Sequence, residues 1–171
     1  MLRKLLFCAI IFFGLRFTLG AVRYTTLEDF ESGFVSLSSW NAEEDVQPDA
    51  WTLDSATPDS SLYCLKLTGN CYKLQQITPY AIDSTGIIQV QVKTSSEPRI
   101  QGIGFTDSVH NILYSFAGNR ILDIEVWIPV YQGAFSSGVW NTYQLPVASD
   151  WEAFWGYLPV INGIIYINDL D

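Results

Sequence analysis

The feature that most constrains the fold of this chain is its series of short β-rich segments, each followed by a turn signal. In Ile88–Lys93 the residues alternate, so that Ile88, Val90 and Val92 face one side and polar residues face the other. No window places apolar residues at i, i+3, i+4 and i+7 over three turns, as an amphipathic helix requires. We therefore predict an all-β fold, an antiparallel β-sandwich in one domain. The predicted strands are Tyr24–Glu31, Phe34–Trp40, Trp51–Asp54, Leu62–Leu67, Tyr72–Ile77, Ile88–Lys93, Ile100–Thr106, Ile112–Phe116, Ile124–Tyr131, Val139–Leu145 and Gly163–Asn168.

The last fifth of the chain, Gly138–Asp171, contains one predicted helical turn. The segment Ser149–Glu152 has the form of a capping box, in which the two end side chains satisfy each other's backbone N–H groups. Gly156 can end the turn in the left-handed conformation, and Pro146 precedes it. We expect a single short helical turn between two closing strands.

The first twenty residues have the layout of a secretory signal peptide. A basic start at Arg3 and Lys4 is followed by the apolar run Leu5–Phe13 and then by small residues. The run is short for a membrane span and Arg16 interrupts any longer one, with an uncleaved anchor as the alternative. We expect 1–20 to be a signal peptide, 21–171 to be a single domain, and the product to be secreted or to lie at the cell surface.

The charge balance of the remaining chain restricts its partners. Cleavage near Gly20 leaves six Lys and Arg against eighteen Asp and Glu, a net charge of −12. Such a surface repels nucleic acid and anionic lipid. We therefore expect no nucleic-acid partner and no membrane insertion after cleavage. The charge suits a soluble secreted protein, or one that collects divalent cations.

Two cysteines remain outside the signal peptide, Cys64 and Cys71, on either side of the predicted tight turn Thr68–Asn70. A disulfide is permissible in a secreted protein. In a hairpin with this loop, however, Cys64 faces Leu74 rather than Cys71. The alternative is that both thiols are small apolar fillers of the core, and the sequence leaves the two possibilities open.

Nothing in the sequence supports catalysis. The only histidine, His110, lies in the polar stretch Asp107–Asn111, whose composition is typical of a turn. A Ser–His–Asp hydrolase needs an activated serine, and no Gly-x-Ser-x-Gly elbow surrounds any serine here. There is no zinc-type cluster and no phosphate-binding glycine loop. We predict that the chain is not an enzyme and that His110 faces solvent.

Carboxylates gather at the ends of the first and last predicted strands. Asp29 and Glu31 close the first strand, and Asp169 and Asp171 close the last. Because the termini of a domain often lie close together, these groups can meet, and Ca²⁺ accepts six to eight such oxygens. Loop residues 43–45 could add ligands. The alternative is that all of them are solvated strand-end charges.

Carbohydrate binding is the other chemistry that the residues suggest. A sugar ring packs its apolar face on an aromatic plane, while its hydroxyls need polar side chains nearby. Trp151 and Trp155 are four residues apart, so they share one helix face and are either both core or both presented to a ligand. The predicted ligand-binding residues are Trp151, Trp155, Tyr157, Asp150 and Asn162.

Several short motifs resemble those of secreted carbohydrate-binding modules with a galactose-binding-domain-like jelly roll. They are the Asp-Phe-Glu-x-Gly start at Asp29–Gly33, followed by Trp40; the strand Leu62–Leu67, followed by Gly69-Asn70; the Trp-x-x-Tyr-x-Leu of Trp140–Leu145; and the closing Ile165–Asp169. The chain departs from the pattern at Cys71-Tyr72, where a tryptophan is expected.

This resemblance implies a jelly roll with a structural calcium between the termini, on Glu31, Asp169 and Asp29. The longer segments Tyr114–Gly118, Val130–Phe135 and Leu145–Pro159 resemble N-terminal modules of large bacterial extracellular proteins, in which further domains follow. The expected function is that of a non-catalytic secreted module that binds a glycan and targets or anchors a larger protein. The alternatives are a protein-binding adhesion domain and a purely structural domain.

Overall fold

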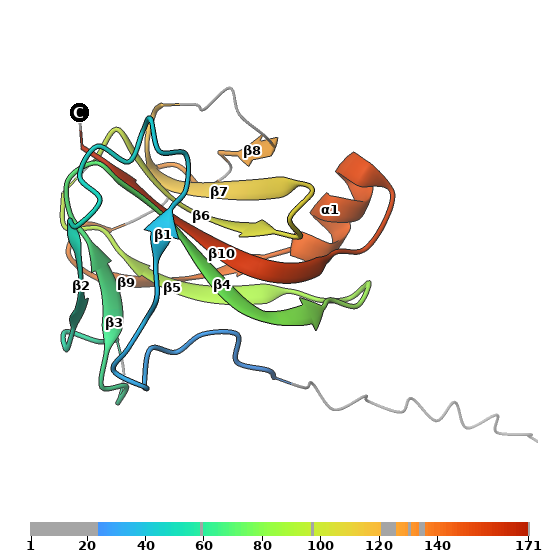
Figure 1. Cartoon of the computed structure of the whole chain (residues 1–171), viewed down its shortest axis with the longest axis horizontal. Coiled ribbons are helices and arrows are strands. Elements are labelled where there is room, and N and C mark those ends of the chain that lie inside the picture. Colours follow the sequence, from blue (N-terminus) through green and yellow to red (C-terminus); the bar gives the residue numbers. More distant parts are fainter. Residues whose placement is uncertain are drawn as a thin grey trace, which may run out of the picture.

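The computed structural model describes residues 24–58, 60–96, 98–120, 126–129, 131–133 and 136–170. In these ranges the chain forms ten strands and one helix, which confirms the predicted all-β class (Figure 1). The predicted signal peptide lies outside the described residues. Across the described ranges, no helix is both long enough and apolar enough to cross a membrane. The elements are β1 (Ser38–Ser39), β2 (Trp51–Asp54), β3 (Cys64–Leu67), β4 (Cys71–Ala81), β5 (Ile88–Lys93), β6 (Ile100–Thr106), β7 (Asn111–Gly118), β8 (Val126–Ile128), β9 (Trp140–Leu145), α1 (Val147–Trp155) and β10 (Val160–Asp169).

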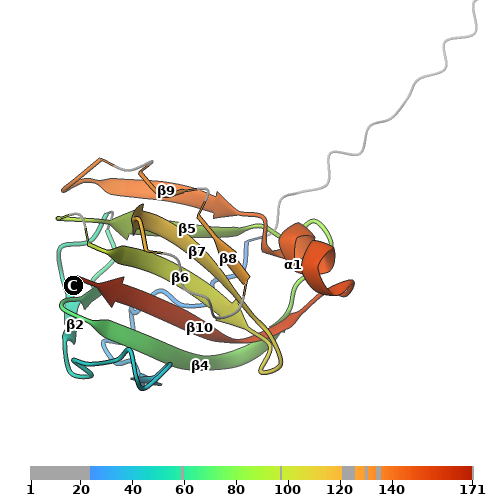
Figure 2. The ribbon, with the colours of Figure 1, turned by 90° about the horizontal axis from the view of Figure 1, so that it is seen from above.

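The strands form a sandwich of two layers (Figure 2). One layer is a six-stranded sheet with the order β1-β4-β10-β6-β7-β8, and the pairs β2–β3 and β5–β9 face it. All neighbouring strands are antiparallel except β7 and β8, which run parallel. The antiparallel sandwich is therefore confirmed, while the jelly-roll connectivity implied by the resemblance stays a prediction.

The main core lies between the two layers. In β5, Ile88, Val90 and Val92 pack against it and the alternate residues are exposed, as the period of two predicts. Burying a large apolar side chain stabilises the fold by about 1.5–3 kcal/mol. The six-stranded sheet contributes Phe105, Tyr114, Phe116, Ile164 and Tyr166.

The six-stranded sheet is also buried on its outer face. All residues of β7 from Ile112 to Ala117 are buried, rather than every second one. Gly104 makes room for this packing, because a Cβ there would lie 2.3 Å from Leu113 Cδ2 and 3.3 Å from Ile165 Cβ. The outer cluster consists of Tyr72, Ile100, Leu113, Ile165 and Ile167, packed against Trp40, Leu74 and Trp127.

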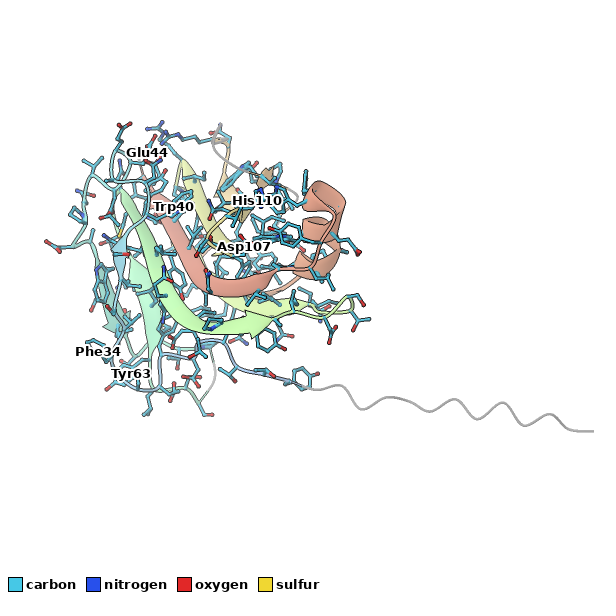
Figure 3. All side chains as sticks on the ribbon, turned by 45° about the vertical axis from the view of Figure 1, so that its right-hand side comes forward. Phe34, Trp40, Glu44, Tyr63, Asp107 and His110 are labelled. Carbon is cyan, nitrogen blue, oxygen red and sulfur yellow. The ribbon has the colours of Figure 1, made fainter. Side chains whose placement is uncertain are left out.

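Asp45 fixes the loop between β1 and β2 over this outer face; Trp40 and Glu44 of the same region are labelled in Figure 3. The buried Asp45 carboxylate accepts hydrogen bonds from Tyr72 N–H (2.9 Å), from Lys73 Nζ (2.5 Å) and from the hydroxyl of Ser39. Lys73 is only 3% exposed, so this is a buried salt bridge. Burial alone would raise the pKa of Asp45, but these hydrogen bonds outweigh it and hold the pKa below its ordinary value.

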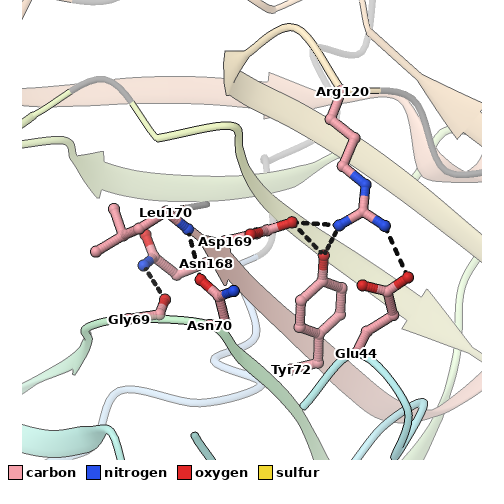
Figure 4. Close-up of polar contacts among 8 residues, drawn as sticks. All are labelled: Glu44, Gly69, Asn70, Tyr72, Arg120, Asn168, Asp169 and Leu170. Atoms are coloured by element: carbon pink, nitrogen blue, oxygen red, sulfur yellow. Dashed lines mark hydrogen bonds and ion pairs between the residues drawn. The ribbon is translucent and has the colours of Figure 1, made fainter. Parts of the chain in front are cut away.

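Arg120 ties the same loop to the end of β10 (Figure 4). Its Nη2 donates to Glu44 Oε1 at 2.7 Å, and its Nη1 donates to Asp169 Oδ2. The Tyr72 hydroxyl donates to the same Asp169 oxygen at 3.2 Å. Burial, followed by the neighbouring Asp169 charge, raises the pKa of Tyr72. One guanidinium thus neutralises carboxylates from the loop and from the last strand.

Two expectations about strands are wrong, and the predicted strand Phe34–Trp40 is a strand only at Ser38–Ser39. The segment Tyr24–Glu31 is not a strand: it ends in a turn, in which Gly33 N–H donates to the Phe30 carbonyl at 3.0 Å. The segments around Cys64 and Cys71 do not form a hairpin, because β3 pairs with β2 while β4 pairs with β1 and β10. Both thiols are free and Cys71 is fully buried, as the apolar-filler alternative predicts for that residue.

The helix is longer than predicted and begins differently. Pro146 occupies the N-cap position and no side chain caps the helix. Ser149 lies inside the first turn, where its hydroxyl donates to the Pro146 carbonyl at 3.1 Å, so the predicted capping box is wrong. Val147 and Ala148 are buried in the core, and their burial outweighs the roughly 1 kcal/mol of a side-chain cap. Gly156 ends the helix with φ 75°, as predicted.

Asp45→Ala tests the role of the buried salt bridge. We expect the free energy of unfolding in urea to fall by about 3–5 kcal/mol, because Lys73 is left buried without its partner. The control is Asp54→Ala, which removes the solvent-exposed pair with Lys66 and should have a much smaller effect. Equal losses in the two variants would contradict this account.

Candidate functional site

An aromatic cluster occupies the end of the sandwich that carries α1 (Figures 1 and 3). We define the aromatic tip as His110, Phe154, Trp155 and Tyr157, with Asp107 below them. Asp107 and His110 belong to the turn between β6 and β7, Phe154 and Trp155 end α1, and Tyr157 follows its C-cap Gly156. β10 brings the two segments together, because it leads away from Tyr157 and pairs with β6, with Gly163 opposite Thr106.

The rings of the aromatic tip form a continuous series that begins in the core. Trp151 is fully buried, and its ring centroid lies 4.6 Å from that of Trp155. The Trp155 ring in turn stacks on the imidazole of His110 at 4.7 Å and 25°. Phe154 and Tyr157 are 56% and 37% exposed, so the series ends in aromatic surface that faces solvent. The tip is therefore anchored by packing rather than carried on a free loop.

Hydrogen bonds fix the polar side of the tip. The Tyr157 hydroxyl donates to Asp107 Oδ2 at 2.5 Å, and His110 Nδ1 lies 2.9 Å from the same hydroxyl. Because the single phenolic proton is given to the carboxylate, Nδ1 must be the donor to Tyr157. Asp107 Oδ1 accepts the N–H groups of Val109 and His110, both at 2.8 Å.

These contacts shift two pKa values in opposite directions. Burial by itself would raise the pKa of Asp107, but the hydrogen bonds from Tyr157, His110 N–H and Val109 N–H hold it below its ordinary value. Burial, together with the hydrogen bond to Asp107, raises the pKa of Tyr157. At neutral pH the pair is therefore a carboxylate and a neutral phenol.

The structure separates the five predicted ligand-binding residues into two groups. Trp155, Tyr157 and Asn162 lie at the tip, where Asn162 Nδ2 donates to Ser108 Oγ at 2.7 Å. Trp151 is enclosed in the core, and Asp150 Oδ2 accepts the hydroxyl of the buried Tyr114 at 2.8 Å. The two tryptophans pack against the same core and against each other, but to different depths: Trp151 is fully buried, whereas Trp155 is only partly buried.

The predicted calcium ligands have other contacts. Glu31 Oε1 accepts the Leu62 N–H at 2.8 Å, Asp29 Oδ1 accepts the Glu31 N–H at 3.0 Å, and Asp169 is paired with Arg120. Asp171 lies outside the described residues. In the part of the chain that the structure describes, no group of three His, Cys, Asp or Glu side chains could hold a metal ion. The calcium site stays a prediction.

Sequence reasoning missed the contribution of the β6–β7 turn. His110 was expected to face solvent, yet it stacks on Trp155, and Asp107 was not singled out as a ligand-binding residue. The turn composition of Asp107–Asn111 indicated a hairpin, but no local signal shows that β10 would place this hairpin beside α1. Only the pairing of β6 with β10 does so.

Comparisons with known proteins give no relative: no protein-family model, no curated protein and no solved structure matches the chain. The resemblance to galactose-binding-domain-like modules therefore stays a prediction.

The free energies of unfolding of Trp151→Ala and Trp155→Ala should distinguish the core tryptophan from the one at the tip. We expect Trp151→Ala to lower the free energy of unfolding by about 3–5 kcal/mol, because it leaves a large cavity in the core. Trp155→Ala should cost clearly less, because its ring is only partly buried. Urea unfolding of both variants checks this, and equal losses would show that Trp155 is also a core residue.

Removing the Tyr157 hydroxyl tests the hydrogen bond between Tyr157 and Asp107. Because the phenol stabilises the ionised carboxylate, Tyr157→Phe should raise the pKa of Asp107, as followed by NMR titration of its carboxyl carbon. A carboxyl with a lowered pKa contributes stability above its unfolded-state pKa of about 3.9 and loses it as pH falls through the folded-state value. The variant should therefore lose less stability in acid.

The control is Tyr63→Phe, far from Asp107 in Figure 3. It should leave both the titration and the acid dependence of stability unchanged. An Asp107 titration that does not move in Tyr157→Phe would rule out the hydrogen bond as the cause of the lowered pKa.

Proposed function

We propose that this chain is a non-catalytic, secreted carbohydrate-binding module whose binding site is the aromatic tip. The observation that carries the proposal is the exposed ring surface of Phe154 and Tyr157, with Tyr157 held next to the Asp107 carboxylate and the His110 imidazole. Aromatic planes accept the apolar faces of sugar rings, and the polar groups at their edges bind hydroxyls. In this role the module would target or anchor a larger extracellular protein.

The rigidity of the tip favours binding. Trp155 is held between Trp151 and His110, and α1 is attached to β7 by the hydrogen bond from Tyr114 to Asp150. A site whose side chains are already fixed loses little conformational entropy when a ligand binds. Weak ligands such as single sugar rings benefit most from this, because they supply few contacts of their own.

Protein-binding adhesion is the second candidate, and a different surface supports it. Phe34 and Leu62 are 74% and 62% exposed, and Tyr63 packs near Gly33 at the same place (Figure 3). Contiguous exposed apolar residues often mark protein interaction sites. This patch is separate from the aromatic tip, so the two candidate functions can be tested independently.

Glycan binding should depend on the exposed rings of the tip. After a glycan array has identified ligands, we expect Tyr157→Ala and Phe154→Ala to weaken binding by about 1–3 kcal/mol, roughly 5-fold to 140-fold, in isothermal titration calorimetry. Phe34→Ala, which removes an even more exposed ring outside the tip, is the control and should bind as the parent does. The absence of any glycan ligand for the folded parent would refute the proposal.

A further inference from the structure

Positive and negative side chains are distributed unequally along the sandwich. The Lys and Arg side chains of the described residues all lie towards the end opposite the aromatic tip. Lys93 pairs with Trp140 at the far end of the β5–β9 ladder, whereas Ile88 pairs with Leu145 next to α1. The remaining ones are Lys66, Lys73, Arg99 and Arg120.

The basic residues of the six-stranded sheet also lie at the end opposite the aromatic tip. Arg99 directly precedes β6, and the carbonyl of Arg99 accepts the Arg120 N–H, so both lie where β6 begins and β7 ends. Lys73 is near the start of β4, which runs towards the tip. Lys66 belongs to β3, on the side of the molecule away from α1 (Figure 1).

Among the residues that the structure describes, the charged groups at the tip end are carboxylates, with His110 beside them. Asp83 follows the end of β4, where Ala81 pairs with Val160. Asp107 lies in the β6–β7 turn, and Asp150 and Glu152 lie on α1. Within the described residues, these carboxylates face no Lys or Arg side chain of their own end. Their field therefore extends into the solvent around the aromatic rings.

Two of these carboxylates are placed to meet a ligand on the rings. Asp107 accepts the Tyr157 hydroxyl and two backbone N–H groups, so its negative charge is fixed beside the Tyr157 ring. Glu152 is exposed and precedes Trp155 by three residues, a spacing that puts both on one helix face. Asp150 contributes charge but is already bonded to Tyr114. Exposed aromatic rings flanked by carboxylates favour a cation, through both ion pairing and the attraction of a cation to a ring face.

We propose, building on the proposed glycan-binding function, that the aromatic tip takes saccharides that carry free amino groups. The ammonium group of a deacetylated hexosamine lies beside Asp107 and Glu152, while the apolar face of the sugar packs on Phe154 or Tyr157. The same field rejects glycans with carboxylate or sulfate groups, because an anion would approach unbalanced negative charge.

The experiment compares oligosaccharides of equal length made of glucosamine, of N-acetylglucosamine and of a uronic acid, by calorimetry at low and at physiological salt. We expect the amino form to bind about fivefold more tightly than the acetylated form, about 1 kcal/mol at 1.4 kcal/mol per decade. This preference should shrink as salt screens the charges. The uronic acid oligomer should not bind.

Charge-removing variants assign the preference to the tip. Asp107→Asn keeps the Oδ1 acceptor of the turn, and Glu152→Gln alters an exposed side chain, so both variants should fold. Each should reduce the preference for the amino form, and Glu152→Gln, which lies outside the hydrogen bonds that hold the tip, should leave binding of the acetylated form nearly unchanged. Asp49→Asn, which removes an exposed carboxylate from the loop between β1 and β2, is the matched control and should keep the preference.

The outcomes separate the two proposals. Equal or weaker binding of the amino form, with binding of the acetylated form intact, overturns this inference and leaves the proposed function standing. No binding of any glycan overturns both. If an oligolysine of the same charge binds as tightly as the amino oligosaccharide, the tip recognises charge alone and the inference fails.

Discussion

The central constraint in this structure is that one sheet is buried on both faces. The inner face of the six-stranded sheet packs against β5, β9 and β3, and the outer face needs its own cover. The loop between β1 and β2 provides it, with Trp40 stacked on Tyr72. A loop has few apolar contacts of its own, so the position of this one depends on Asp45. The Asp45 carboxylate accepts the backbone N–H of Tyr72 in β4, just beyond the last residue pair of β1 and β4.

The bounds of several strands could be predicted from the sequence, whereas their partners in the sheets could not. β2, β5 and β6 were predicted with their observed bounds, because short β-rich runs bounded by turn residues locate strands well. Strand pairing was less predictable. The Thr68–Asn70 turn indicated a hairpin of β3 and β4, yet each strand finds its partners elsewhere, since β4 is needed in the large sheet and β3 in the opposite layer.

In the candidate site, too, residues close together in the sequence could be predicted, whereas those brought in by strand pairing could not. Trp155 and Tyr157 were accessible to sequence reasoning because they lie two residues apart at a helix end. Asp107 and His110 were not, because their place beside Trp155 results from the ladder between β6 and β10, more than fifty residues apart in sequence. The capping-box pattern at Ser149–Glu152 misled for a related reason: burial of Val147 in the core set the start of the helix.

The short outer strands of the six-stranded sheet bear on how the molecule behaves among copies of itself. β1 has two residues and β8 has three, so neither offers a long row of free backbone groups to a neighbour. Further along β4, Pro79 removes one donor from the edge that β1 leaves uncovered. Interrupted edges of this kind oppose strand-to-strand aggregation. At high local density, copies of the molecule can therefore lie with their tips side by side without their sheet edges pairing.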